Sequence, residues 1–274
     1  MSSSFKLDLT GRTALITGGS RGIGAACVRS FVAAGARVVF NYQKSKEQAD
    51  SLVKECGAEN CHAIQAELDS AASADKLVTE AVAKFGRIDI LIANHGIWPP
   101  HDAPIDQMTE EQWRRTLAIN LDSVFGLVKY TVAKMKSRSP HTAAAGAGTP
   151  VESRAIRGHI VLISSTAGQR GEAFHADYAA TKGAVISMVK GLSTELAPDG
   201  IYVNCVAPGW VSTDMAAPAL ASGDGRAKIF RTIPLGRVGK PEEIAASALF
   251  LCTPHAGFIT GEIMNVNGGA VLVG

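Results

Sequence analysis

The sequence predicts an α/β protein in which helices cover both faces of a parallel sheet. Short apolar runs alternate with segments of helical periodicity along the chain, as in consecutive β–α–β units. The apolar runs are nearly continuous, which is typical of strands buried on both sides. The 274 residues, 46% hydrophobic and 19% charged, suit a single domain with a large interior.

The individual elements follow from this alternation. Strands are expected near residues 13–17, 37–41, 61–65, 88–93, 159–164, 202–206 and 263–266. Helices are expected near residues 23–34, 46–56, 71–85, 110–135, 176–196 and 242–251. Ser45 with Gln48, and Thr109 with Gln112, have the spacing of capping boxes at two of the helix starts. No internal repeat is apparent.

Composition limits the classes of function. A net charge of +2 gives no electrostatic reason to expect nucleic acid or an anionic membrane as partner. The five cysteines lack metal-ligand spacing and are expected to be free thiols in a reducing compartment. There is no apolar signal core at the N-terminus and no apolar run of membrane-spanning length. A cytoplasmic location is therefore the expectation.

The turn after the first strand, residues 17–24 (TGGSRGIG), is glycine-rich and leads into a helix. Such glycines let backbone N–H groups approach a pyrophosphate at the helix N-terminus. Many strand–helix turns contain glycine without binding a nucleotide, but the required strand before and helix after are both predicted. A dinucleotide site is expected here.

The end of the second strand predicts which dinucleotide is bound. An NAD site usually places an acid there to bind the ribose 2′-hydroxyl, whereas this chain has Asn41. Arg21, Lys44 and Ser45 are close enough in sequence to hold a 2′-phosphate. NADP(H) is therefore predicted to be preferred, with NAD(H) as the alternative. Ser45 can also cap the following helix while the lysines stay solvated.

Tyr178 and Lys182 lie four residues apart in a predicted helix and share one of its faces. A free tyrosine titrates near pH 10, and a neighbouring ammonium favours the phenolate, so Lys182 is expected to lower the pKa of Tyr178. Ser165, thirteen residues earlier at a strand end, can meet the same substrate oxygen. The alternative is a surface tyrosine beside a solvated lysine.

Other candidate residues follow the remaining strands. Glu67 and Leu68 are expected beside the adenine. His95 is expected to be structural or pocket-lining rather than a base, and Trp210 is a pocket wall or ordinary packing. Asn120 lies inside an apolar helical stretch and needs hydrogen-bond partners. It is expected to fix a kinked backbone, to hold a water molecule in a proton path, or to be a packing residue with satisfied hydrogen bonds.

Two segments depart from the alternation of strands and helices. Residues 137–157 are rich in Ala, Gly, Ser, Thr and Pro and predict a flexible insertion at the N-terminal side of the strands, away from the chemistry. Residues 212–235, small, polar and interrupted by glycines, predict a substrate lid or a plain surface excursion.

Together these residues resemble the short-chain dehydrogenase/reductase family over nearly the whole chain outside the insertion. The motifs PLGR (234–237) and PEEI (241–244), and NGG (267–269) near the end of the chain, are similar to those of the 3-oxoacyl-acyl-carrier-protein reductase branch. Two departures stand out: the family's Asn-Asn-Ala-Gly is ANHG at 93–96, and its usual Asp at the adenine edge is Glu67. The first weakens any assignment of substrate.

The resemblance implies a doubly wound Rossmann-type domain, residues 1–274, with a seven-stranded parallel sheet. It implies a proton-donating Tyr178, a Ser165 that binds the substrate oxygen, a Lys182 that holds the ribose, and an Asn120 that positions water. The cofactor residues it implies are Gly18, Ser20, Arg21, Gly22, Ile23, Gly24, Asn41, Tyr42, Lys44, Ser45, Glu67, Leu68, Asn94, His95, Gly96, Tyr178, Lys182, Pro208, Gly209, Val211 and Thr213. The substrate residues are His95, Trp98, Ala167 and Trp210.

The implied function is reduction of a carbonyl or oxidation of a secondary alcohol, with a 3-oxoacyl thioester, carrier-bound or free, as one candidate substrate. Sugar, polyol or steroid dehydrogenases on the same scaffold are the alternative, because substrate choice lies in loops. A nucleotide-sensing protein without catalysis is the alternative from another class. No metal is required, and the family suggests a homotetramer.

Overall fold

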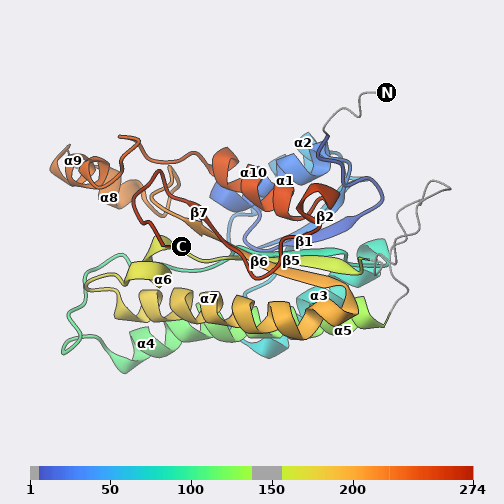
Figure 1. The fold of residues 1–274 in the computed structure, drawn as a ribbon, viewed down its shortest axis with the longest axis horizontal. Helices are drawn as coiled ribbons and strands as arrows, with labels where there is room; N and C mark the ends of the chain where they lie inside the picture. The colour runs from blue at the N-terminus through green and yellow to red at the C-terminus, as the bar shows by residue number, and fades with distance from the viewer. Residues whose placement is uncertain (1–5, 138–155, 222, 274) are drawn as a thin grey trace.

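The residues that the computed structural model describes, 6–137, 156–221 and 223–273, form a sheet of seven parallel strands (Figure 1). The spatial order is β3-β2-β1-β4-β5-β6-β7. The strands are β1 (Thr13–Ile16), β2 (Arg37–Tyr42), β3 (Cys61–Gln65), β4 (Ile90–Ala93), β5 (Gly158–Ile163), β6 (Ile201–Pro208) and β7 (Ile263–Val266). The predicted fold class and all seven predicted strands are confirmed.

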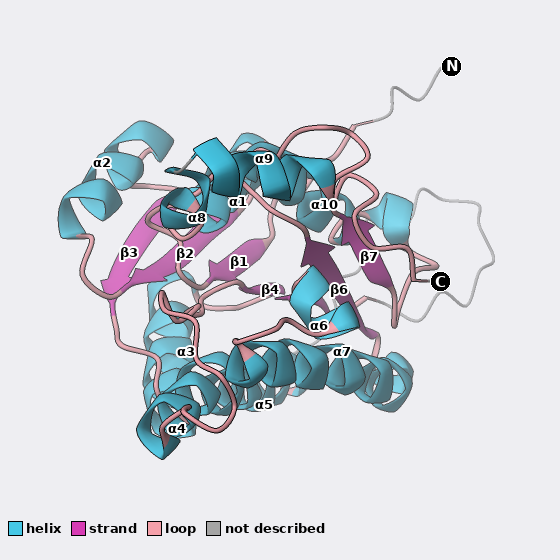
Figure 2. Cartoon of the chain, turned by 90° about the vertical axis from the view of Figure 1, so that its left-hand side faces the viewer, coloured by secondary structure: helices cyan, strands magenta, loops and turns pink. Residues whose placement is uncertain are grey.

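Helices cover both faces of the sheet (Figures 1 and 2). One layer holds α1 (Gly22–Ala33), α2 (Lys46–Cys56) and α10 (Pro241–Leu251). The other holds α3 (Ala71–Phe85), α4 (Glu110–Leu117), α5 (Ser123–Lys136) and α7 (Ala176–Leu196). The helices α6 (Thr166–Arg170), α8 (Ala217–Ala221) and α9 (Gly223–Arg231) lie toward the carboxyl ends of the strands. Within the described residues, no helix is long and apolar enough to cross a membrane.

Each face of the sheet has its own apolar core. Ile16 of β1 packs into the cluster that holds Phe31 of α1, and the adjacent Leu15 points to the opposite cluster with Leu77 and Leu127. All of these side chains are fully buried. Burying one such side chain contributes roughly 1.5–3 kcal/mol, so the alternation along buried strands fixes the sheet between its two helix layers.

The single helix expected over residues 110–135 is interrupted in the structure. A π-helical turn, Ala118–Asp122, separates α4 from α5. The predicted cap at Thr109 is present, since its hydroxyl accepts the N–H of Gln112 at 3.1 Å. Ser45 precedes α2 but makes no capping hydrogen bond, so the capping box predicted there is wrong.

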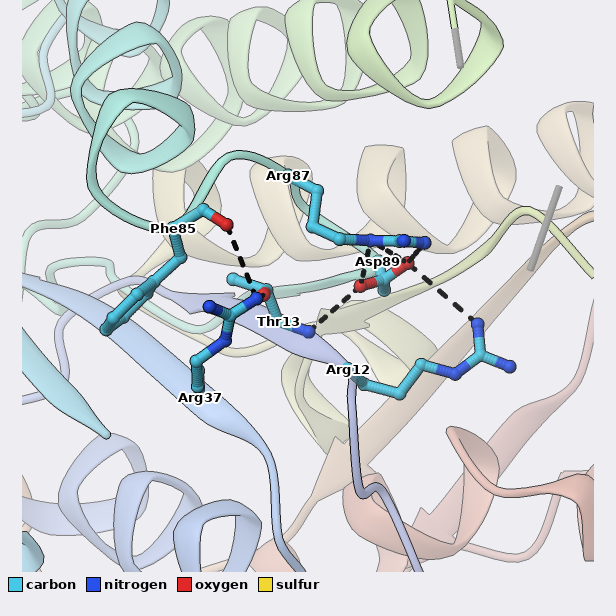
Figure 3. Close-up of polar contacts among 6 residues, drawn as sticks. All are labelled: Arg12, Thr13, Arg37, Phe85, Arg87 and Asp89. Atoms are coloured by element: carbon cyan, nitrogen blue, oxygen red, sulfur yellow. Dashed lines mark hydrogen bonds and ion pairs between the residues drawn. The ribbon is translucent and has the colours of Figure 1, made fainter. Parts of the chain in front are cut away.

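Charged side chains meet at the amino ends of β1 and β4 (Figure 3). The carboxylate of Asp89 is fully buried and receives the Arg87 guanidinium, with Nε at 2.9 Å and Nη2 at 2.5 Å. The backbone N–H of Thr13 donates to the same carboxylate at 2.9 Å, and Arg12 Nη1 lies 3.9 Å away. Arg37 Nη2 reaches the Phe85 carbonyl at 3.4 Å. This cluster joins β1 to β4 at the edge away from the pocket described below.

Part of the predicted domain organisation is not covered by the structure. Most of the insertion predicted at 137–157 lies outside the described residues, which stop at 137 and resume at 156. The insertion is preceded by α5, which ends at Lys136, and followed by β5, which begins at Gly158. The predicted lid, residues 212–235, contains α8 and α9. These helices were not predicted, because they are short and because Gly223 and Gly225 at the start of α9 are poor helix formers.

Candidate active site

A cavity of about 390 Å³ runs along the carboxyl ends of the strands. It begins at the glycine turn between β1 and α1 and ends among residues of α6 and α7. β1 and β4 are neighbours there, and the chain order reverses between them. In open α/β sheets ligands bind in the crevice at such a switch point.

The glycine turn is closely packed and leaves the start of α1 free. A Cβ on Gly24 would lie 2.0 Å from the Gly18 carbonyl oxygen, so only glycine fits there. Asn94 Nδ2 donates to the Thr17 carbonyl at 3.0 Å and braces the turn from β4. No side chain caps the N-terminus of α1 at Arg21. Its first N–H groups therefore remain available to an anion, which fits a pyrophosphate.

Asn41 lines the cavity, but its amide is engaged by the backbone. Its Oδ1 accepts the Gly18 N–H at 2.8 Å, and its Nδ2 donates to the Ala66 carbonyl at 3.0 Å. The side chain is 3% exposed. Asn41 therefore joins the end of β2 to the segments that follow β1 and β3.

The outer end of the cavity, near β2, carries positive charge. Arg21, Lys44 and Ser45 all line it, and no acid stands at the end of β2. Arg21 Nη1 is 3.3 Å from Asp214 Oδ2, and both side chains are well exposed. Glu67 accepts a hydrogen bond from Gln43 Nε2 at 2.6 Å, so its carboxylate is partly occupied.

Ser165, Tyr178 and Lys182 line the inner end of the cavity together. Ser165 follows β5 and caps α6, because its hydroxyl oxygen accepts the Ala167 N–H at 3.1 Å. Lys182 is buried, and its Nζ donates to the Ile163 carbonyl at 2.8 Å. Nζ also lies 5.7 Å from the centre of the Tyr178 ring. Burial lowers the pKa of Lys182 to about 8.

The pKa of Tyr178 differs from the sequence-based expectation. Burial raises it to about 12, the Ser165 hydroxyl lowers it and the charge of Glu172 raises it further. Lys182 does not contribute to this shift, and its Nζ donates to the Ile163 carbonyl. The expectation of a phenol acidified by Lys182 is therefore wrong for this structure, and Tyr178 is protonated at neutral pH.

Asn120 lies in the π-helical turn, below the cavity rather than in its lining. Its Oδ1 accepts the Ile97 N–H and its Nδ2 donates to the Ile97 carbonyl, both at 2.8 Å. A Cβ on Gly96 would lie 3.1 Å from Asn120 Oδ1 and 3.6 Å from Lys182 Nζ. Glycine at 96 thus allows the amide and the ammonium to approach each other.

His95 bridges β1 to the π-helical turn. The Thr17 hydroxyl oxygen accepts the N–H groups of Asn94 and His95 at 3.0 and 3.2 Å, so its own hydrogen is donated to His95 Nδ1 at 2.8 Å. Nε2 then carries the imidazole proton and faces Ser123 Oγ at 2.7 Å and the Ile119 carbonyl at 3.1 Å. Burial and the Lys182 charge lower the pKa of His95 to about 3. The neutral His95 ring therefore has a structural role and lines the cavity, in agreement with the prediction that it is not a base.

Aromatic rings wall the substrate end of the cavity. The rings of Trp98 and His175 stack with centres 4.6 Å apart, and Trp98 meets Trp210 edge-on at 6.1 Å. His175 Nε2 is 3.0 Å from the Pro99 carbonyl. The four predicted substrate residues all line the cavity, the other two being His95 and Ala167.

The cavity unites nearly all of the predicted residues. Among the predicted cofactor residues, Gly24 alone is absent from its lining, because it packs beneath the turn. Sequence reasoning missed several lining residues: Gln43, Ile97, Arg115, Ile163, Arg170, Glu172, Asp214 and Met215. Arg170 and Glu172 lie between Ser165 and Tyr178, a position that could have drawn attention to them.

Comparisons with known proteins agree with this geometry. A family model described as enoyl-(acyl carrier protein) reductase matches residues 18–271. The chain is 38% identical to a 3-oxoacyl-[acyl-carrier-protein] reductase of Synechocystis sp., covering 96% of this chain and 98% of the relative. It is 36% identical to an acetoacetyl-CoA reductase of Rhizobium meliloti, with 94% and 98% coverage. A solved short-chain dehydrogenase/reductase from Brucella melitensis, described as a glucose/ribitol dehydrogenase, superposes with a TM-score of 0.84 at 36% identity, covering 98% of this chain and all of that one.

Proposed function

The chain belongs to the short-chain dehydrogenase/reductase family, and we propose that within it this protein is an NADP(H)-dependent 3-oxoacyl thioester reductase. As a family member it is an oxidoreductase that uses a nicotinamide cofactor and acts on a carbonyl or alcohol. The observation that carries the proposal is the meeting of Ser165, Tyr178 and Lys182 at the inner end of a cavity that starts at the glycine turn.

The residues present fit a nicotinamide dinucleotide. The uncapped N-terminus of α1 and the glycine turn would hold the pyrophosphate, and Lys182 would hold the nicotinamide ribose. When bound, the cofactor supplies or accepts the hydride. Arg21, Lys44 and Ser45 would bind a 2′-phosphate, because no acid at the end of β2 repels it. NADPH is proposed over NADH for this reason.

Tyr178 acts as the proton donor in the proposed reduction. With a pKa of about 12 it keeps its proton at neutral pH and gives it up only as negative charge develops on the substrate oxygen. The Ser165 hydroxyl accepts the Ala167 N–H and is hydrogen-bonded to Tyr178, and we propose that its hydrogen is donated to the same oxygen when substrate is bound. Lys182, with a pKa of about 8, is mostly cationic at neutral pH, and its proposed role is to hold the nicotinamide ribose.

Asn120 completes the proposed catalytic set. Its amide is fixed on Ile97, and it approaches Lys182 across Gly96. We assign it the role of positioning water beside Lys182, from which the phenolate regains its proton. The 212–235 segment is proposed as the substrate lid, because Thr213, Asp214, Met215 and Ala216 at its base line the cavity.

The proposed substrate class rests on the relatives that reduce 3-oxoacyl and acetoacetyl thioesters. A carrier-bound acyl chain, a homotetramer and a cytoplasmic location are parts of the same proposal. A sugar or polyol dehydrogenase is the second candidate, and it is favoured by Glu172, a hydrogen-bond acceptor in the substrate half of the cavity.

The test is NADPH oxidation followed by absorbance with an acetoacetyl thioester, a ketose and a cyclic ketone. A crotonyl thioester is added because the family model is named for an enoyl reductase. The acetoacetyl thioester is expected to give the highest kcat/KM, and NADPH to exceed NADH. Preference for the ketose or the crotonyl thioester would overturn the proposed substrate class.

A further inference from the structure

The substrate half of the cavity contains a carboxylate that the mechanism above does not use. Glu172 lies between α6 and α7, is half-buried and lines the cavity near Tyr178, whose pKa its charge raises. Burial raises the pKa of Glu172 itself, while His175, Trp98 and Arg170 lower it. A carboxylate withdrawn from water beside aromatic rings is costly unless hydrogen-bond donors reach it.

The loop that presents Glu172 is held in place on its neighbour. Phe174 has a backbone φ of 65°, which residues other than glycine rarely adopt. Its carbonyl accepts the Ala103 N–H at 3.0 Å. His175 stacks on Trp98 and contacts the Pro99 carbonyl. Such strained backbone persists where surrounding contacts fix it, and it is frequent at ligand sites. The carboxylate therefore has a defined position.

Glu172 has acceptor capacity to spare. A carboxylate accepts about four hydrogen bonds. The Trp98 side chain supplies one. Arg170 and His175 act on the carboxylate through their charges. Glu172 lines the cavity, so a bound ligand can reach its remaining lone pairs.

We propose that Glu172 is a specificity-determining residue that accepts a hydrogen bond from a hydroxyl or amide N–H of the substrate near the reacting carbonyl. The inference rests on the proposed function in that Tyr178 marks where the carbonyl is reduced. A pantetheine thioester offers amide N–H groups, and a polyol or sugar offers hydroxyl groups. A site built to bind such a donor discriminates strongly against an analogue that lacks it.

The test uses two substrate pairs that differ in one donor. Acetoacetyl-N-acetylcysteamine carries an amide N–H that acetoacetyl ethyl thioester lacks, and 1-hydroxybutan-2-one carries a hydroxyl that butan-2-one lacks. kcat/KM is measured for the parent, Glu172→Ala, Glu172→Gln and Asp102→Asn. Asp102 is the matched control, because its charge also acts on Glu172 but it does not line the cavity.

Glu172→Ala is expected to lower kcat/KM for a donor-bearing substrate roughly tenfold to a hundredfold, the loss typical of a charge-assisted hydrogen bond. The donor-free partner should change by no more than about twofold. Glu172→Gln keeps the shape and an acceptor oxygen, so its loss should be smaller, and Asp102→Asn should leave both pairs unchanged. A response in the amide pair identifies a thioester substrate, and one in the hydroxyl pair identifies a polyol or sugar.

Equal losses within each pair would mean that Glu172 only supports the loop, and would overturn the inference. No loss with either donor would overturn it as well. For both outcomes, only the part of the turnover that is lost in Tyr178→Phe is compared between the parent and the Glu172 variants. Turnover that survives Tyr178→Phe would instead overturn the proposed function, so the two failures can be told apart.

Discussion

A buried charge lies at each end of the parallel strands, and the two differ in whether an opposite charge compensates them. At the amino ends of the strands, Asp89 is surrounded by the Arg87 guanidinium, the Thr13 N–H and, farther away, Arg12. At the carboxyl ends, the buried Lys182 donates to a neutral carbonyl, and within the described part of the chain no carboxylate pairs with it. A satisfied charge stabilises the fold, whereas an uncompensated one is available for chemistry.

Removing the phenol hydroxyl at the carboxyl edge should have the largest effect. Tyr178→Phe is expected to lower kcat by roughly 10²–10⁴-fold, the usual contribution of general acid catalysis. Cofactor affinity, measured by fluorescence titration, should remain close to that of the parent. Tyr202→Phe makes the same change near the opposite edge and should leave kcat unaltered. Near-normal turnover of Tyr178→Phe would remove the assigned role.

Breaking the satisfied charge should affect stability and leave chemistry alone. Asp89→Ala removes the carboxylate that accepts hydrogen bonds from Arg87 and the Thr13 N–H and forms an ion pair with Arg12. Losing one partner of a buried pair lowers the free energy of unfolding by about 3–5 kcal/mol. Urea unfolding measures this loss, and kcat per folded molecule should be unchanged. Asp199→Asn, in the exposed pair with Lys136, should cost at most about 1 kcal/mol. Equal losses at the two sites would contradict the difference drawn between them.

Removing the uncompensated charge should stabilise the protein while abolishing activity. The pKa of Lys182 is about 8 in the folded state and 10.5 as the reference value. Between those values the unfolded state binds more protons, so the stability contributed by this group rises with pH across that window. Below pH 8 the full cost is present, on the order of 3 kcal/mol.

Lys182→Met should therefore unfold at higher urea concentration than the parent at pH 7, by roughly 1–3 kcal/mol after the loss of the Ile163 hydrogen bond. The difference should shrink as pH approaches 10.5. Paired urea titrations at pH 7 and 10 measure it. A variant less stable than the parent at pH 7 would show that Lys182 is well compensated.

The smallest effect is expected at the open end of the cavity, where charge meets solvent. Arg21→Ala should lower kcat/KM with NADPH about tenfold and barely change the value with NADH, because only a 2′-phosphate needs the guanidinium. Added salt should narrow the parent's preference for NADPH. Steady-state kinetics with both cofactors at two ionic strengths decide it, and a parent enzyme that favours NADH would refute this assignment.

Strand positions and the grouping of Ser165, Tyr178 and Lys182 could be predicted because they depend on local apolar runs and on spacing along a helix. The pKa of Tyr178 could not, because it depends first on burial of the phenol, which tertiary packing determines, and then on the neighbouring Ser165 and Glu172. Glu172 escaped notice for a similar reason. Its hydrogen bond with the Trp98 side chain joins residues from two separate loops.

The amide of Asn41 limits how this enzyme can be re-engineered for another cofactor. Asn41→Asp would give the end of β2 the acid typical of NAD sites. However, the new carboxylate oxygen would replace the Nδ2 donor and face the Ala66 carbonyl, acceptor against acceptor, 3.0 Å away. Asn41→Asp would thus loosen the glycine turn that is proposed to hold the pyrophosphate. Routes to a changed cofactor, in the laboratory or in evolution, are more open at Arg21 and Lys44, which are exposed and whose replacement disturbs no buried contact.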